Sequence, residues 1–147
     1  MSEKLHMIKL VVGLSDLESF YRHQGASVTD YNGAPANIVY TRYKPKSADE
    51  ILSSGGSIYR VLNRRILCRQ KILGFEQVET KEKGTMCAIM TETDIVQTYA
   101  KPKRPFQGWR YLHPKDAPKD RGFYTGGGAL DEVPPDLEAD LIESGLL

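Results

Sequence analysis

Basic residues gather in three short segments of this sequence, and their type and spacing point to chemistry. Guanidinium groups bind phosphates bidentately, and unpaired bases stack on exposed aromatic rings, so basic segments with aromatic neighbours predict binding to single-stranded nucleic acid or RNA. The first segment holds Arg42, Lys44 and Lys46. The second, free of acids across residues 60–71, holds Arg60, Arg64, Arg65, Arg69 and Lys71. In the third, Lys101, Lys103, Arg104 and Arg110 surround Phe106, Trp109 and Tyr111.

The residues predicted to contact a nucleic acid or another anion combine these bases with aromatic and amide side chains. They are Arg42, Lys44, Lys46, Tyr59, Arg69, Arg104, Phe106, Gln107, Trp109 and Arg110. Trp109 and Phe106 have a second interpretation, in which they plug the open end of a sheet beside a structural ion pair of Arg110. For Trp109 we favour the plug, because the adjacent Gly108 indicates a tight bend that packing fixes.

No set of residues in the sequence forms a convincing catalytic or metal site. The three histidines lack metal-ligand spacing with one another or with either cysteine. The glycines at 126–128 lack the lysine and hydroxyl residue of a phosphate-binding loop. We therefore expect a binding protein that has no catalytic residues, cofactor or metal, and whose partner is nucleic acid, with RNA favoured.

Two other classes of function stay open. One is an enzyme that acts on a small phosphorylated or nucleotide substrate, with Arg42, Arg69 and Arg110 clamping the anion. The other is a protein-interaction module that docks a partner on a C-terminal helix. Basic segments that converge on one groove favour nucleic-acid binding, whereas a deep pocket with an acid/base pair favours the enzyme.

Charge divides the chain of 147 residues into a basic body and an acidic tail. Residues 1–130 contain all 20 bases and 13 of the 19 acids, whereas residues 131–147 contain six acids and no base. This asymmetry predicts a single basic domain over 1–130 and an acidic helical tail over 131–147. We expect the tail helix, at 135–144, to dock on the body by its narrow apolar stripe.

Composition predicts a cytoplasmic protein that does not bind membranes. No apolar run approaches the roughly 18 residues of a membrane span. Cys68 and Cys87 are too few for a disulfide scaffold, so we expect two buried free thiols. The sequence does not specify the oligomeric state.

Hydrophobic patterns predict several strands and few helices. Strands are expected at 6–12, 37–43, 57–62, 64–73, 85–91 and 94–100. Capping boxes that begin at Ser15 and Ser47 predict two short helices, which end near Gly25 and Gly55. Because helices do not alternate with strands, we expect an α+β fold with a small curved antiparallel sheet or a β-barrel.

Several strings of this sequence resemble a known bacterial family. They are TR at 41–42, PK at 45–46, GGSIY at 55–59, RQ at 69–70, RPFQGWRYL at 104–112 and DAP at 116–118. Over nearly its whole length the chain resembles the domain of unknown function 1489, mostly from alphaproteobacteria. It departs from the family pattern at Arg60, where many members carry tryptophan. The family implies no activity.

A second resemblance concerns the fold. A short helix that ends in Gly-Gly, followed by paired strands with interleaved arginines, is similar to the PUA and ASCH group of small β-barrels. Members of that group usually bind RNA or modified bases in a cleft between barrel and helices. The resemblance therefore implies an RNA ligand, with Arg42, Lys46, Tyr59 and Arg69 as the matching positions.

Overall fold

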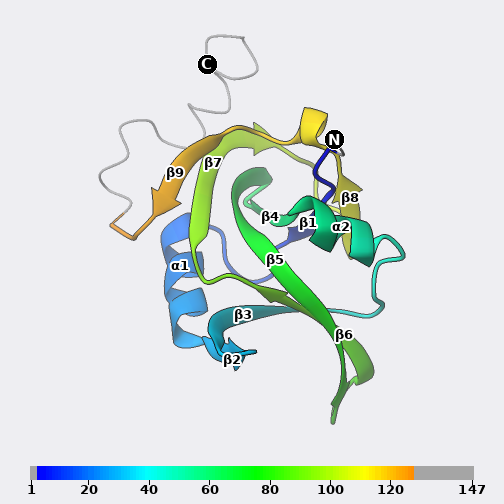
Figure 1. Ribbon diagram of the computed structural model, residues 1–147. Helices are drawn as coiled ribbons and strands as arrows, with labels where there is room; N and C mark the ends of the chain where they lie inside the picture. The colour runs from blue at the N-terminus through cyan, green and yellow to red at the C-terminus, as the bar shows by residue number, and fades with distance from the viewer. Residues whose placement is uncertain (1–2, 128–147) are drawn as a thin grey trace.

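A computed structural model describes residues 3–127 as a strand-rich fold with two α-helices (Figure 1). The predicted helix at 135–144 and the acidic tail lie outside these residues. The elements in chain order are β1 (His6–Leu10), α1 (Leu17–Ala26), β2 (Thr29–Tyr31), β3 (Ala34–Thr41), α2 (Ala48–Ser54), β4 (Ser57–Leu62), β5 (Arg65–Thr80), β6 (Gly84–Thr91), β7 (Ile95–Pro102), β8 (Trp109–Leu112), the 3-10 helix η1 (Pro114–Asp116) and β9 (Asp120–Tyr124).

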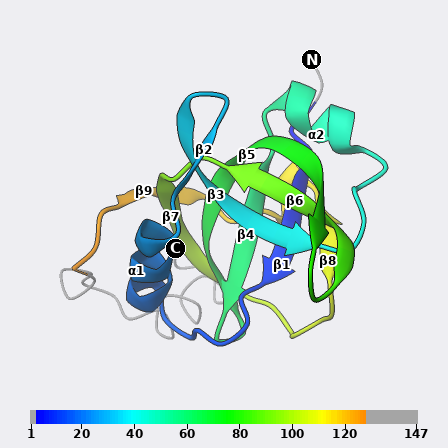
Figure 2. The ribbon, with the colours of Figure 1, turned by 90° about the horizontal axis from the view of Figure 1, so that it is seen from below.

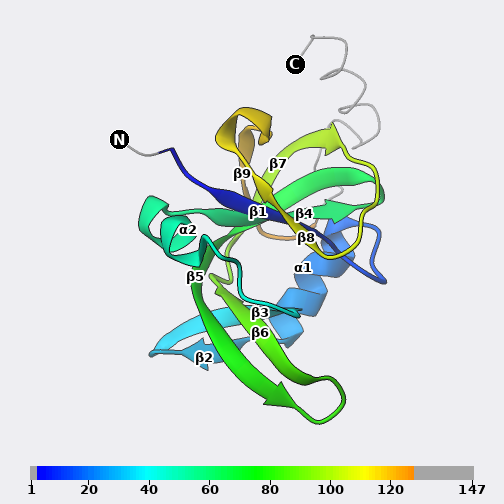
Figure 3. The same cartoon turned by 90° about the vertical axis from the view of Figure 1, so that its right-hand side faces the viewer.

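The long strand β5 connects two layers of the sheet. Its first half pairs with β4 and β7, and its second half pairs with β6. The first layer therefore contains β8, β1, β4, β7 and β9, and the second contains β6, β3 and β2. A register shift between Ile72 and Gly74 lies where β5 passes from one layer to the other. Figure 3 shows β5 running from the first layer down into the second.

Three apolar clusters hold the layers and the helices together. The first lies between the layers and joins Met7 and Ile58 to Val39 and Ile89, with Ile51 of α2. The second packs Phe20 of α1 against the ends of β4 and β5. The third covers the opposite face of the first layer, where Phe106 packs over β1 and β4. Figure 2 shows α1 and α2 at opposite ends of the sheet, so each helix closes one end of this packing.

The expectation of an α+β fold with a small antiparallel sheet or a PUA-like barrel is wrong. Half of the described residues lie in strands and 16% in helices, and the sheet is not closed. The sheet is mixed, because β1 pairs with β4 in parallel through Met7–Ile58 and the residues that follow. Parallel partners need a long crossover, and the chain between β1 and β4 supplies it with α1, β2, β3 and α2.

Most predicted elements of the described chain exist, with shifted ends. Asp16, not Ser15, caps α1, because its carboxylate accepts a hydrogen bond from the Ser19 backbone N–H at 2.8 Å. Helix α2 follows Ser47 and ends at Gly55 in the left-handed conformation, with φ of 78°. The sequence analysis missed β2, β8 and β9, which are three to five residues long and lack a clear alternation.

Gly56 lies where the end of α2 meets the start of β1. A Cβ atom at this position would stand 1.9 Å from the Leu5 carbonyl oxygen. The Gly56 N–H also donates to the Ile51 carbonyl at 2.8 Å, and its own carbonyl accepts from Ile72 N–H at 3.1 Å. The backbone therefore has little room to move away from a side chain.

We predict that Gly56→Ala lowers the free energy of unfolding by about 1–3 kcal/mol or more, since this is the range for overpacked sites. Gly25→Ala is the matched control, because a Cβ there has no heavy atom within 4 Å and alanine favours a helix by roughly 0.5–1 kcal/mol. Urea unfolding of both variants measures the difference. Equal unfolding midpoints for the two variants would contradict the close approach of Gly56 to Leu5.

Candidate anion-binding sites

The structure separates the ten predicted site residues into three environments. The exposed residues are Arg42, Lys44, Lys46, Arg104, Gln107 and Arg110. The aromatic residues that pack against the apolar clusters are Tyr59, Phe106 and Trp109. Arg69 stands apart from both groups, because it forms an ion pair.

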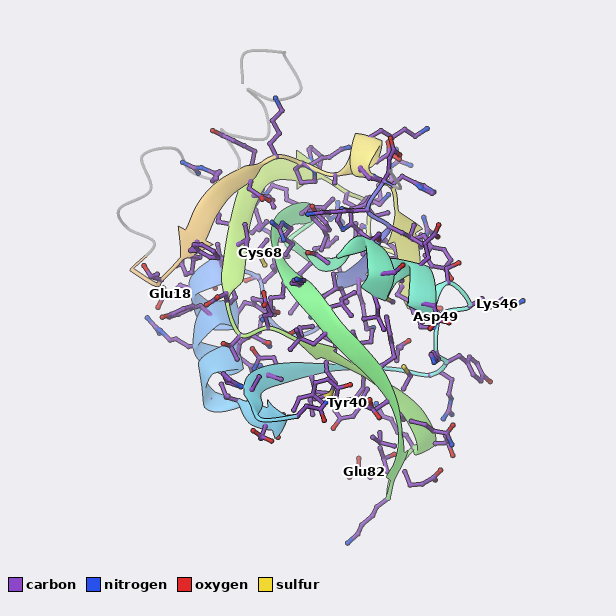
Figure 4. The ribbon with its side chains drawn as sticks, in the orientation of Figure 1. Glu18, Tyr40, Lys46, Asp49, Cys68 and Glu82 are labelled. Atoms are coloured by element: carbon purple, nitrogen blue, oxygen red, sulfur yellow. The ribbon has the colours of Figure 1, made fainter. Side chains whose placement is uncertain are left out.

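Two of the three basic segments meet at the edge strand β8. The Ser47 backbone N–H donates to the Tyr111 hydroxyl at 3.1 Å, which holds the loop at 42–47 beside β8 (Figure 3). Figure 4 shows Lys46 at the right-hand side, extending away from the molecule beyond α2. We call the exposed residues of this region the basic edge: Tyr43, Lys44, Lys46, Arg104, Gln107, Arg110 and Tyr111.

Arg110 is the base of this edge that the protein orients most clearly. Its guanidinium carbon lies 4.7 Å from the centre of the Phe106 ring, and Lys103 Nζ lies 5.8 Å from the same ring. A ring face attracts a cation without occupying its N–H donors. The Arg110 donors are therefore held at the surface by stacking, where an anion can reach them.

The predicted aromatic residues serve packing rather than open stacking. Tyr59 is 4% exposed and meets His6 edge-to-face with a ring separation of 5.0 Å. Trp109 packs against the cluster between the layers and meets Tyr111 edge-to-face at 4.8 Å. This placement corresponds to the plug interpretation of Trp109. Exposed rings occur instead at Tyr43 and Phe123, which are 76% and 72% exposed, and at Tyr40 and Tyr111, which are 49% and 37% exposed.

Arg69 is committed to bonds within the protein. Its Nε and Nη2 atoms donate to the two carboxylate oxygens of Asp120, at 2.9 and 2.7 Å. Its Nη1 atom donates to the Ser57 hydroxyl at 2.8 Å. This hydrogen bonding raises the pKa of Arg69 and lowers the pKa of Asp120. These three bonds connect β5 to β9 and to β4, so the role of Arg69 in the fold is structural.

The structure does not assemble Arg42, Arg69 and Arg110 into one clamp. Arg110 and Arg69 stand in the same cross-strand row, but Ile8 and Tyr59 lie between them. Neighbouring strands are about 4.8 Å apart, so three strand spacings separate the two arginines. Arg42 Nη1 donates to the carbonyl oxygens of Lys83 and Thr85, at 2.7 and 3.2 Å, which holds the turn between β5 and β6.

The sequence analysis passed over Lys9 and Lys83, and it did not select Arg60. These three bases line a cleft of about 780 Å³ between β1, β3 and α1, and no carboxylate of residues 3–127 belongs to its lining. Lys9 and Arg60 are paired residues of β1 and β4. The available signal was a base inside an apolar strand: Lys9 lies between Ile8 and Leu10, and Arg60 lies in a strand whose six residues are all buried.

The fold strongly changes the environment of the titratable side chain of His6. It is 5% exposed, and its Nδ1 accepts a hydrogen bond from the Ser57 N–H at 2.9 Å. Burial, together with the positive charges of Arg69 and Lys4, lowers the pKa of His6 to about 4. The ring is therefore neutral near pH 7, with its proton on Nε2.

His6 predicts a loss of stability in mild acid. Unfolded His6 binds a proton below about pH 6.5, whereas folded His6 stays neutral down to about pH 4, so stability falls as the pH falls through this window. The loss is complete below about pH 4 and amounts to roughly 3 kcal/mol. His6→Asn keeps an acceptor for Ser57 but does not titrate, so urea unfolding between pH 7 and 4 should show a shallower decline. An identical decline in both proteins would assign the acid sensitivity to other groups.

Within residues 3–127, no three histidine, cysteine, aspartate or glutamate side chains are grouped to hold a metal ion. No helix in that range has the length and apolar character needed to cross a membrane.

Comparison with known proteins identifies a family for the chain. The chain matches no curated protein and no solved structure. The family model described as protein of unknown function (DUF1489) matches residues 7–147, which include both the basic edge and the cleft. Since this match spans most of the sequence, the chain belongs to the DUF1489 family.

Proposed function

We propose that this protein binds nucleic acid, with single-stranded RNA the favoured class, through the basic edge and without catalysing a reaction. The observation that supports this proposal is the hydrogen bond between Ser47 and Tyr111, which are 64 residues apart in the sequence. This bond holds the loop at 42–47 beside β8, so two basic segments that are distant in the chain adjoin the same edge strand. Convergence of basic segments is the arrangement that phosphate groups along a strand require.

The chemistry of the basic edge suits an unpaired strand better than a duplex. Tyr43, 76% exposed, offers a ring face to a base, while Lys44 and Lys46 beside it offer charge to the backbone. Aromatic stacking of this kind tolerates any base sequence. In this proposal Tyr43 is the stacking ring of the basic edge, whereas Trp109 packs against the cluster between the layers.

The charge of the described chain favours the same partner. All 20 bases and only 13 of the 19 acids lie within residues 3–127, an excess of seven positive charges. Asp49 and Glu50 stand in the first turn of α2, next to the loop of the basic edge. Their charge repels phosphates from α2, so the strand is expected to follow β8 instead.

We predict RNA binding that weakens with salt. Each neutralised phosphate of a single strand contributes roughly −0.7 to the slope of log affinity against log salt, so three to five contacts give about −2 to −3.5. Replacing Lys44, Lys46 and Arg110 with glutamine should make the slope shallower by about 2. Fluorescence anisotropy with a mixed-sequence RNA at several salt concentrations measures both slopes.

The matched control removes three charges elsewhere. Lys71, Lys115 and Lys119 are exposed and lie outside the basic edge, and their replacement with glutamine should change the slope by much less. Equal losses in the two triple variants would indicate attraction to the whole charged body rather than to this edge. Absence of binding at low salt would remove the proposal.

A further inference from the structure

We propose that the cleft lined by Lys9, Arg60 and Lys83 binds the phosphate group of a small phosphorylated molecule. The proposal is independent of nucleic-acid binding at the basic edge, because it rests on different residues. Three features of the cleft support it: a buried arginine without an acidic partner in residues 3–127, two further cations and apolar walls large enough for an organic body.

Arg60 is a buried cation without an acidic partner among the described residues. It is 6% exposed, and its Nε and Nη2 atoms donate to the carbonyl oxygens of Lys9 and Leu10, at 3.2 and 3.3 Å. Its guanidinium carbon lies 5.5 Å from the centre of the Phe20 ring. These contacts orient the group but supply no negative charge, and a buried charge without a partner is costly. An anion in the cleft would supply that charge.

Lys9 and Lys83 add positive charge to the same space. Burial lowers the pKa of Lys9, and the charges of Arg60 and Lys83 lower it further. Burial also lowers the pKa of Arg60, to about 10. Since no carboxylate of the described part of the chain lines the cleft, these cations repel one another in the absence of a ligand. A dianionic phosphate relieves this repulsion more fully than a single carboxylate does.

The position of Lys83 is fixed from another part of the chain. Lys83 stands at the turn between β5 and β6, and Arg42 donates to its carbonyl oxygen at 2.7 Å. The guanidinium of Arg42 therefore serves as a support that holds this turn beside the cleft. Glu82, the neighbour of Lys83 along the chain, is exposed at the tip of the hairpin and does not line the cleft (Figure 4).

The walls of the cleft indicate what the phosphate is attached to. A volume of about 780 Å³ exceeds what inorganic phosphate needs and lies within the range of organic ligand pockets. Leu10, Leu14, Phe20 and Ile38 give it apolar walls, and Tyr40 contributes a half-exposed ring from β3. The ligand is therefore a phosphomonoester with an apolar or aromatic body.

Phenyl phosphate is a suitable probe, because it combines a phosphomonoester with an aromatic ring. Titration calorimetry should show saturable binding of phenyl phosphate, binding of inorganic phosphate at least 10-fold weaker, and no binding of phenol. Lys9→Gln and Lys83→Gln should each weaken phenyl phosphate about 5- to 10-fold. Lys115→Gln, an exposed lysine outside the cleft lining, is the matched control and should leave the affinity unchanged.

Arg60→Lys tests the guanidinium itself while retaining the charge, and it should weaken binding more than either lysine variant. Because Arg60 is buried, thermal melting must first show that this variant folds. If Arg60→Lys does not fold, the two lysine variants still test the proposal. No binding of phenyl phosphate at millimolar concentration, or an affinity unchanged in both lysine variants, would overturn the proposal.

A competition experiment separates a small molecule from the end of an RNA chain. One RNA is used with and without a 5′-phosphate. If neither RNA competes with phenyl phosphate, the cleft is a phosphomonoester site for a small molecule. If only the phosphorylated RNA competes, the cleft is a phosphomonoester site that accepts the 5′ end of an RNA chain. Equal competition by both RNAs would show that the cleft binds the strand backbone, which overturns the phosphomonoester assignment. If the protein binds no RNA at the basic edge but still binds phenyl phosphate, the proposed function fails and the proposal for the cleft stands.

Discussion

The partner change along β5 is the constraint on which the rest of the structure depends. One strand serves two layers, and its register shifts between Ile72 and Gly74. At Gly74 the Tyr31 side chain of β2 packs directly on β5, because a Cβ there would stand 2.2 Å from the Tyr31 hydroxyl. Beside it the fully buried Gln70 donates to the Asn37 side chain at 3.2 Å and to the Glu92 carbonyl at 3.0 Å. These polar contacts link β5 to β3 and to the segment after β6, and the cleft lies between β1 and β3.

Arg69 and Arg60, which lie on paired strands of the first layer, have different charge environments. Arg69 faces outward from the first layer, where Asp120 neutralises it and the Ser57 hydroxyl accepts a hydrogen bond from its Nη1. Arg60 faces the space between the layers, where, among the described residues, it donates to two carbonyl oxygens and lies over a ring. The first arrangement stabilises the fold by itself, whereas the second is completed by an anion. A buried base that lacks an acid is therefore better evidence for a ligand than an exposed base.

Local patterns made much of the fold predictable, whereas pairing between distant residues was not. Alternating apolar residues predicted β4, β6 and β7 closely, and Asn63 was correctly placed at the turn before β5, where its φ is 48°. The parallel pairing of β1 with β4 spans about fifty residues and leaves no local pattern. The partner of Arg69, Asp120, is 51 residues away for the same reason. Among the site residues, exposed bases were found by composition, but a register shift after Arg60 obscures which face its side chain takes.

The most direct test of this account observes the Arg60 guanidinium itself. The measurement is a ¹H–¹⁵N spectrum of the arginine side chains. The Nε–H groups of Arg60 and Arg69 both donate to acceptors, at 3.2 and 2.9 Å. The signal of Arg60 is assigned as the one that disappears in Arg60→Lys. Titration with phenyl phosphate should shift the Arg60 signal saturably and leave Arg69, which is locked on Asp120, unchanged. An Arg60 signal that stays in place, or one that moves in parallel with Arg69, would contradict the proposal that the buried Arg60 binds an anion.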